Sequence, residues 1–204
     1  MTRIPHQKHR GVPADERRQK RREKLVGAAI QVYGRSGFRQ ATVKSVCEAA
    51  GLTERYFYES FPNSEALLVA AFDAVATQFR VCLRNAAESV DEVGERRVQR
   101  LLDEFFMRLA CDQPAARLFL IEACGVSEGC DAILEEVLSD IADLLEAAWG
   151  ARTSADPLLK IAVSGGLNQM ATSWIASDCA RPVEEVSTLG VRLTACLRAA
   201  ASGG

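Results

Sequence analysis

Residues 42–61 read TVKSVCEAAGLTERYFYESF, and this stretch decides the fold of the N-terminal third of the chain. Apolar residues recur every three or four positions on both sides of Gly51, the spacing of two short amphipathic helices. Thr42 and Thr53 stand where each helix would begin, and threonine is a favoured N-cap residue. Glycine readily adopts the left-handed backbone of a tight bend, so Gly51 should end the first helix. The stretch therefore predicts a helix-turn-helix, whose second helix enters the major groove of DNA.

The sequence on both sides of this stretch predicts more helices and no strands. Ala (31 residues) and Leu (20 residues) dominate the composition. No apolar–polar alternation of the kind found in strands is sustained. We therefore expect an all-α fold with a flexible arm at residues 1–13, a three-helix domain at 14–62 and a larger helical domain at 63–204. The nine expected helices cover residues 15–37, 42–50, 53–61, 64–88, 95–111, 114–123, 127–149, 155–176 and 182–201.

Charge is distributed unevenly, although the net charge is only −2. Residues 1–60 hold 13 of the 25 Lys and Arg but only 6 of the 27 Asp and Glu. A basic N-terminal third joined to an acidic remainder indicates that one part of the chain binds a polyanion. Nucleic acid is the leading candidate.

Residue usage argues against several other classes of protein. His6 and His9 are the only histidines, so the rest of the chain lacks the commonest general base and transition-metal ligand. The seven cysteines are scattered without a C-x-x-C pair, which argues against a disulfide framework or a zinc site. No stretch is typical of a membrane span or a secretory signal. We expect a cytoplasmic protein with no metal, no cofactor and no membrane contact.

The residues TVKSVCEAAGLTERYFYESFPNSEAL (Thr42–Leu67) resemble the DNA-binding domain of TetR-family (tetracycline-repressor-like) transcriptional regulators. The clear part of the resemblance covers about residues 22–70. It implies a homodimer that binds an inverted-repeat operator, usually as a repressor released by a small ligand. It also implies that residues 63–204 bind the ligand and form the dimer. Ser60 and Ser64 replace a histidine and a lysine that the family often has, so we assign no phosphate contacts to them.

The second helix of the motif carries the candidate base contacts. Arg55, in its first turn, can hold O6 and N7 of guanine with its guanidinium fork. Tyr56 and Tyr58 flank the apolar Phe57 and should point away from the core. The resemblance makes Tyr58 a phosphate contact, while Tyr56 would touch a thymine methyl or a sugar; the alternative for both is packing on the preceding helix. Glu54 either stabilises the helix N-terminus or accepts a hydrogen bond from a cytosine amine.

Candidate phosphate contacts surround that helix. Thr42 and Thr53 are expected to cap their helices, a role compatible with a phosphate at the same helix end. Lys44 lies within reach of a phosphate, the alternative being an ordinary solvated lysine. Arg21 and Arg22 belong to a basic run in the first turns of a helix, where cations oppose the helix dipole, so we interpret them as contacts to the DNA backbone. The arm would reach the minor groove with Arg3, Lys8 and Arg10.

The candidate dimer interface lies on the last two predicted helices, where the resemblance places it. Two adjacent glycines inside an apolar helical pattern weaken a helix, and they indicate the close approach of another helix. The candidates, any of which could instead belong to the core of one chain, are Gly165, Gly166, Met170, Trp174, Leu189, Leu193 and Leu197.

Aromatic residues with a few polar neighbours are the candidates for a ligand pocket. Core packing is the alternative for most of them. They suggest a hydrophobic small molecule, with Asn168 or Gln169 fixing its orientation. The candidates are Phe72, Phe105, Phe106, Phe119, Glu122, Asn168 and Gln169.

The function that follows is a DNA-binding transcriptional regulator, ligand-released and without enzymatic activity. A second hypothesis is a redox-sensing regulator that uses a cysteine, which lacks support because no basic cluster clearly lowers a thiol pKa. From other classes, a cysteine-dependent enzyme is opposed by the missing histidines. A helical module that binds RNA or acidic proteins is opposed by the helix-turn-helix spacing.

Overall fold

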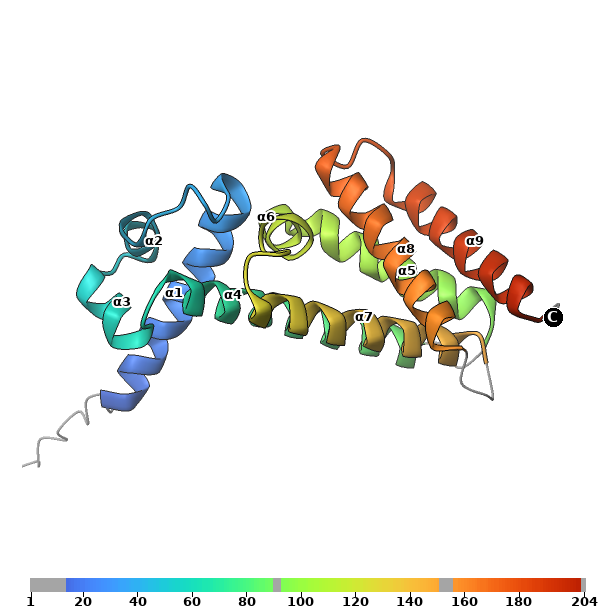
Figure 1. The fold of residues 1–204 in the computed structure, drawn as a ribbon, viewed down its shortest axis with the longest axis horizontal. Coiled ribbons are helices and arrows are strands. Elements are labelled where there is room, and N and C mark those ends of the chain that lie inside the picture. Colours follow the sequence, from blue (N-terminus) through green and yellow to red (C-terminus); the bar gives the residue numbers. More distant parts are fainter. Residues whose placement is uncertain (1–13, 90–92, 151–155, 203–204) are drawn as a thin grey trace, which may run out of the picture.

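The computed structural model describes residues 14–89, 93–150 and 156–202, and every regular element in these segments is helical (Figure 1). The all-α prediction is confirmed, while the predicted arm at residues 1–13 lies outside the described residues. In chain order the elements are α1 (Ala14–Ser36), α2 (Val43–Ala50), α3 (Glu54–Ser60), α4 (Ser64–Glu88), α5 (Glu95–Cys111), α6 (Gln113–Arg117), the π-helical turn η1 (Leu118–Glu122), α7 (Glu128–Ala148), α8 (Pro157–Ala176) and α9 (Val183–Ser202).

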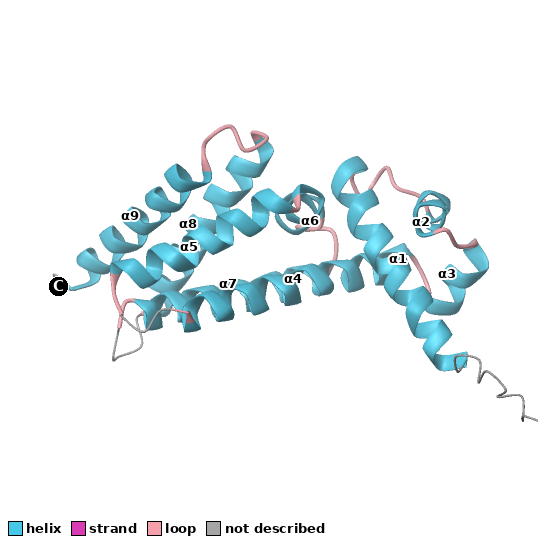
Figure 2. Cartoon of the chain, turned by 180° about the vertical axis from the view of Figure 1, so that it is seen from behind, coloured by secondary structure: helices cyan, strands magenta, loops and turns pink. Residues whose placement is uncertain are grey.

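The helices form two groups in an elongated molecule. Helices α1 to α3 lie at one end and α5 to α9 at the other, as Figures 1 and 2 show from opposite sides. Helix α4 belongs to both groups, because it packs on α1 near its start and on α5 and α7 along its length. At 1.5 Å per residue its 25 residues span about 37 Å. One rigid helix therefore joins the two ends of the molecule.

The helix ends follow from local chemistry. Thr42 caps α2 by accepting from the Ser45 backbone N–H, and the Ser45 hydroxyl oxygen accepts from the Thr42 N–H in return. Gly51 ends α2 with φ +64°. Thr53 holds the N-cap position of α3 but makes no capping hydrogen bond with its side chain, which corrects the role predicted for it. Asn63 caps α4 instead, accepting from the Ala66 N–H.

The predicted helix over residues 114–123 is in fact two elements. Helix α6 begins one residue earlier, at Gln113, and the chain changes to a π-helical turn from Leu118. The Ala123 N–H donates to the Leu118 carbonyl, five residues back, at 3.2 Å. A turn of five residues is too short for apolar spacing to distinguish it from an α-helical turn.

Aromatic stacking fills the centre of the larger group of helices. Phe119 in η1 stacks on Phe72 of α4, with 5.1 Å between the ring centroids. The ring of Phe79, also on α4, is tilted against Phe119, with 5.1 Å between these two centroids. Phe106 meets Trp174 edge-on at 5.6 Å. These side chains are fully or almost fully buried. They form the core that fixes α4 against η1 and α5 against α8.

Helix α1 meets the larger group at α6, where the two backbones touch. A Cβ atom on Gly34 would lie 2.0 Å from the Pro114 carbonyl oxygen, closer than any side chain can be. Glycine is therefore required at this crossing. The three-helix group is held to the rest of the chain by this contact and by the continuous helix α4.

Helix α4 is long and apolar enough, by length and composition, to cross a membrane. Its apolar side chains are instead the core of this fold, with Leu67, Leu68 and Phe72 fully or almost fully buried. A core helix of a globular protein passes the same test of length and hydropathy, so the match does not indicate a membrane segment.

Candidate nucleic-acid interface

Helix α3 presents one face to the core and the other to solvent. Phe57 is fully buried and Phe61 nearly so, and the two rings lie 6.1 Å apart. On the outer side Tyr58 is 61% exposed and the Arg55 side chain 84% exposed. Glu54, in the first turn, is exposed as well. Glu54, Arg55 and Tyr58 are thus all exposed to solvent, as a recognition helix requires.

Helix α2 and the turn supply polar groups beside that face. Thr42, Lys44 and Thr53 are exposed. Lys44 lies 3.9 Å from Glu48, a loose pair between solvated side chains that competes little with a phosphate. The Thr53 hydroxyl is not used as a cap, so it remains available to an outside acceptor. Their exposure leaves the phosphate contacts expected of them as predictions.

The arginines of α1 have a structural role beyond the one predicted. Arg18 donates to the Glu59 backbone carbonyl and Arg22 to the Ser60 carbonyl, each at 3.0 Å. These are the last carbonyls of α3, which no helical N–H can reach. Cations at a helix C-terminus also interact favourably with its dipole. The dipole of α1, which the sequence reveals, gives no sign that arginines of α1 cap another helix.

Arg21 and Arg22 are also partly covered by aromatic rings. The Arg21 guanidinium lies 4.5 Å from the centre of the Tyr56 ring, and that of Arg22 lies 4.1 Å from the Phe61 ring. The Arg21 side chain is only 24% exposed and lies 3.6 Å from a Glu59 oxygen. These contacts show that the two arginines position α3, and the predicted contacts to phosphate stay predictions. Tyr56, half-buried, packs against α1, the alternative foreseen for it.

Glu59 is a site residue that sequence reasoning missed. One carboxylate oxygen accepts from Arg55 Nε at 3.0 Å and the other lies 3.6 Å from Arg21 Nη2. The signal available in the sequence was the spacing of four residues between Arg55 and Glu59, which pairs opposite charges on a helix surface. The link to Arg21 needed the tertiary structure.

The predicted dimer residues divide into four kinds. Trp174 is buried in its own chain, and its ring N–H donates to the Arg181 carbonyl, which removes it from the candidate interface. A Cβ on Gly166 would lie 3.0 Å from Leu193, so this glycine serves the packing of α8 on α9. Gly165 is exposed with open space above it. The remaining candidates are half-buried: Met170, Leu189, Leu193 and Leu197.

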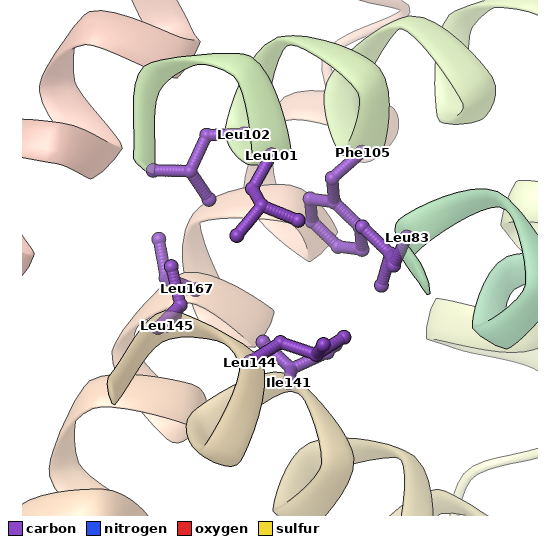
Figure 3. A pocket seen from close by; sticks show the side chains of 8 residues that line it. All are labelled: Leu83, Leu101, Leu102, Phe105, Ile141, Leu144, Leu145 and Leu167. Atoms are coloured by element: carbon purple, nitrogen blue, oxygen red, sulfur yellow. The ribbon is translucent and has the colours of Figure 1, made fainter. Parts of the chain in front are cut away.

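An apolar cavity of about 10 Å³ lies among α4, α5, α7 and α8 (Figure 3). That volume holds about one water molecule. Leucines of α5 face leucines and an isoleucine of α7, with Leu83 of α4 at the side. The lining residues are Leu83, Leu101, Leu102, Phe105, Ile141, Leu144, Leu145 and Leu167.

Of the predicted ligand residues only Phe105 lines this cavity. Phe72, Phe106 and Phe119 belong to the stacked core. Glu122 lies 3.9 Å from Arg117 and under Gly37, near α1. Gln169 is exposed on α8 and donates to Ser173, and half-buried Asn168 is not among the lining residues. The structure does not bring the seven candidates together.

Cys82 and Cys130 lack the features of a redox sensor. Burial, with the hydrogen bond to Glu104, raises the pKa of Cys82 to about 11. Burial and nearby carboxylates raise the pKa of Cys130 to about 11 as well. A raised thiol pKa lowers the fraction of reactive thiolate. No group of three or more His, Cys, Asp or Glu that could hold a metal occurs in the described part of the chain.

A three-helix unit with an exposed, arginine-bearing third helix defines a helix-turn-helix DNA-binding protein of the transcriptional-regulator class. Residues 25–71 match the family model described as bacterial regulatory proteins, tetR family. The predicted resemblance to tetR-family transcriptional regulators is confirmed over these residues.

Three relatives illustrate the likeness. The fatty acid metabolism regulator protein of Bacillus subtilis (strain 168) is 20% identical over 164 residues, 76% of this chain and 83% of the relative. The fatty acid degradation regulator FadR of Bacillus halodurans shares the fold with a TM-score of 0.72 and 22% identity, over 85% of this chain and 94% of that one. FadR from Bacillus subtilis, solved with stearoyl-CoA, has a TM-score of 0.71 and 18% identity, over 84% and 96%.

Proposed function

We propose that this regulator is a cytoplasmic repressor that binds an inverted-repeat operator as a homodimer and is released by a hydrophobic small molecule. One observation carries the proposal. Helix α4 begins just after the exposed recognition helix α3, and its far end lines an apolar cavity through Leu83. DNA bound by α3 and a ligand bound in the cavity therefore both affect the position of α4.

The DNA contacts in this proposal are those of α3 and its surroundings. Arg55 binds guanine and Tyr58 binds a phosphate, while Tyr56, half-buried against α1, offers its remaining surface to a sugar or methyl group. Glu54 lies over the bases, and the backbone is held by Thr42, Lys44 and Thr53. The exposure of Arg55 and Tyr58 on one face supports this assignment.

The dimer in this proposal forms through the outer face of α8 together with α9. Leu158 is 75% exposed and Ile161 66% exposed, and Gly165 continues the same side of the helix four residues later. Large exposed apolar side chains in a row are typical of an association surface. A dimer would place two α3 helices about 34 Å apart, on one face of the duplex.

The effector in this proposal carries a long acyl chain. The cavity is lined by leucine, isoleucine and phenylalanine, and the FadR relative from Bacillus subtilis was solved with stearoyl-CoA. A cavity of about 10 Å³ cannot hold such a chain in its present form. Entry must separate α4 from α5 and α7, and α4 would carry that movement to α3.

Two measurements test the proposal. Selection from random duplexes should enrich an inverted repeat, and stearoyl-CoA should then lower the affinity for it, whereas CoA without an acyl chain should not. By reciprocity the duplex must weaken stearoyl-CoA binding by the same factor, about 5–150-fold for typical coupling. Enrichment of no symmetric site would contradict the DNA assignment. Equal stearoyl-CoA affinities with and without the duplex would contradict release by an acyl chain.

A further inference from the structure

We propose that Glu59 is a specificity-determining residue that holds Arg55 away from DNA until a guanine replaces its carboxylate. The proposal rests on the base contact assigned to Arg55 above. It starts from one arrangement: the two oxygens of the Glu59 carboxylate are divided between two arginines. Arg55 donates to one at 3.0 Å, and Arg21 approaches the other at 3.6 Å.

The two arginines are held very differently. Arg21 is largely covered, with its guanidinium over the Tyr56 ring. Arg55 is 84% exposed, and the structure gives it a single contact to the carboxylate through Nε. An exposed pair of this kind is weak. Arg55 can therefore leave while Arg21 and Glu59 stay together.

The contact between Glu59 and Arg21 lowers the free-energy cost of moving Arg55 from Glu59 to a base. A carboxylate that loses its only partner beside DNA would be repelled by phosphate without compensation. Glu59 keeps Arg21 after Arg55 has left, and its backbone carbonyl remains bound to Arg18 at 3.0 Å. The carboxylate is thus fixed in place and only Arg55 moves.

This arrangement selects among DNA sequences. Guanine offers O6 and N7 to the guanidinium as a matched pair of acceptors, whereas an unrelated base pair does not. On the wrong sequence Arg55 stays on Glu59, and the carboxylate also repels phosphates that approach the helix. On a sequence that offers a guanine to Arg55, the bidentate contact to this base replaces the single contact to Glu59. Specificity of this kind comes from penalising the wrong partner.

Three variants test the proposal against a pure charge effect. Glu59→Gln removes the carboxylate, Glu59→Asp keeps the charge but withdraws it by one methylene, and Glu48→Gln removes a matched charge from α2. Glu48 is exposed and loosely paired with Lys44 at 3.9 Å, so it is a fair control. The readout is affinity for the selected operator and for a scrambled duplex of equal length, across a range of salt concentrations.

We expect Glu59→Gln to raise affinity for the scrambled duplex and to reduce the operator-to-scrambled ratio about 5–10-fold, within the range that one bidentate contact supplies. Glu59→Asp should reduce the ratio in the same direction without a change in net charge. Glu48→Gln should raise both affinities together and leave the ratio unchanged. In an Arg55→Ala background, Glu59→Gln should no longer change the ratio.

Several results would overturn the proposal. Equal effects of Glu59→Gln and Glu48→Gln on the ratio would reduce Glu59 to a simple charge, as would an unchanged ratio for Glu59→Asp. If Arg55→Ala leaves operator affinity intact, the base contact assigned to Arg55 is wrong and the proposal about Glu59 falls with it. If Arg55→Ala weakens operator binding but the Glu59 variants match the control, only the proposal about Glu59 fails. Thermal melting of each variant checks that it is folded.

Discussion

The α3 face and the core around Phe119 hold their side chains in opposite ways. On α3 the contacts are polar, exposed and loose, as the pair between Arg55 and Glu59 shows. Around Phe119 they are apolar and closed, with the ring of Phe72 stacked on it and that of Phe79 tilted against it. The first can exchange partners at little cost, while the second cannot lose an atom without leaving a void. Recognition therefore lies in the loose part of the molecule, and the closed part fixes its position.

The largest expected effect comes from opening the closed part. Phe119→Ala should lower the free energy of unfolding by about 3–5 kcal/mol, because it removes a ring that is 1% exposed and packed on Phe72 and Phe79. Val81→Ala, at an exposed position on α4, should change it by less than about 0.5 kcal/mol. Urea unfolding measures both. A loss below about 1 kcal/mol for Phe119→Ala would mean that the ring lines a pliable ligand pocket instead of the core.

The next largest effect is expected where α1 crosses α6, the contact between the three-helix group and the rest of the chain. Gly34→Ala places a Cβ 2.0 Å from the Pro114 carbonyl oxygen, and we expect it to cost about 1–3 kcal/mol as α1 is forced from α6. Gly27→Ala, on the same helix with open space around it, should instead stabilise by about 0.5–1 kcal/mol, because alanine favours a helix. Denaturant midpoints of the two variants should move in opposite directions. A shared direction would show that α1 and α6 are less closely packed than described.

The same contrast explains what could be predicted from the sequence. The helix-turn-helix was predicted with its bend and the Thr42 cap because these signals are local: Gly51 must bend, and Phe57 must face inward to place Tyr58 outward. The ligand and dimer residues were not separated correctly. The sequence shows that Trp174 and Phe119 are apolar and that Gly166 is small, but not whether each lies in the core or on the surface. That distinction depends on the residues that surround each of them in the folded structure. Arg22 shows the limit most clearly, because its partner, the Ser60 carbonyl, lies 38 residues away.

The smallest expected effect concerns Arg22. Its measurement distinguishes a structural role, in which Arg22 holds the C-terminus of α3, from a contact to the DNA backbone. Arg22→Ala loses the hydrogen bond to the Ser60 carbonyl and the contact over the Phe61 ring, and we expect about 1 kcal/mol less stability. Arg17→Ala, at an exposed position of the same helix, should leave stability unchanged. The salt dependence of operator binding separates the two roles further. A lost phosphate contact lowers the slope of log affinity against log salt by about 0.9, whereas a lost brace weakens binding through misplacement of α3 and keeps the slope. An unaltered unfolding curve with a lowered slope would return Arg22 to the DNA backbone and leave the C-terminus of α3 held by Arg18 alone.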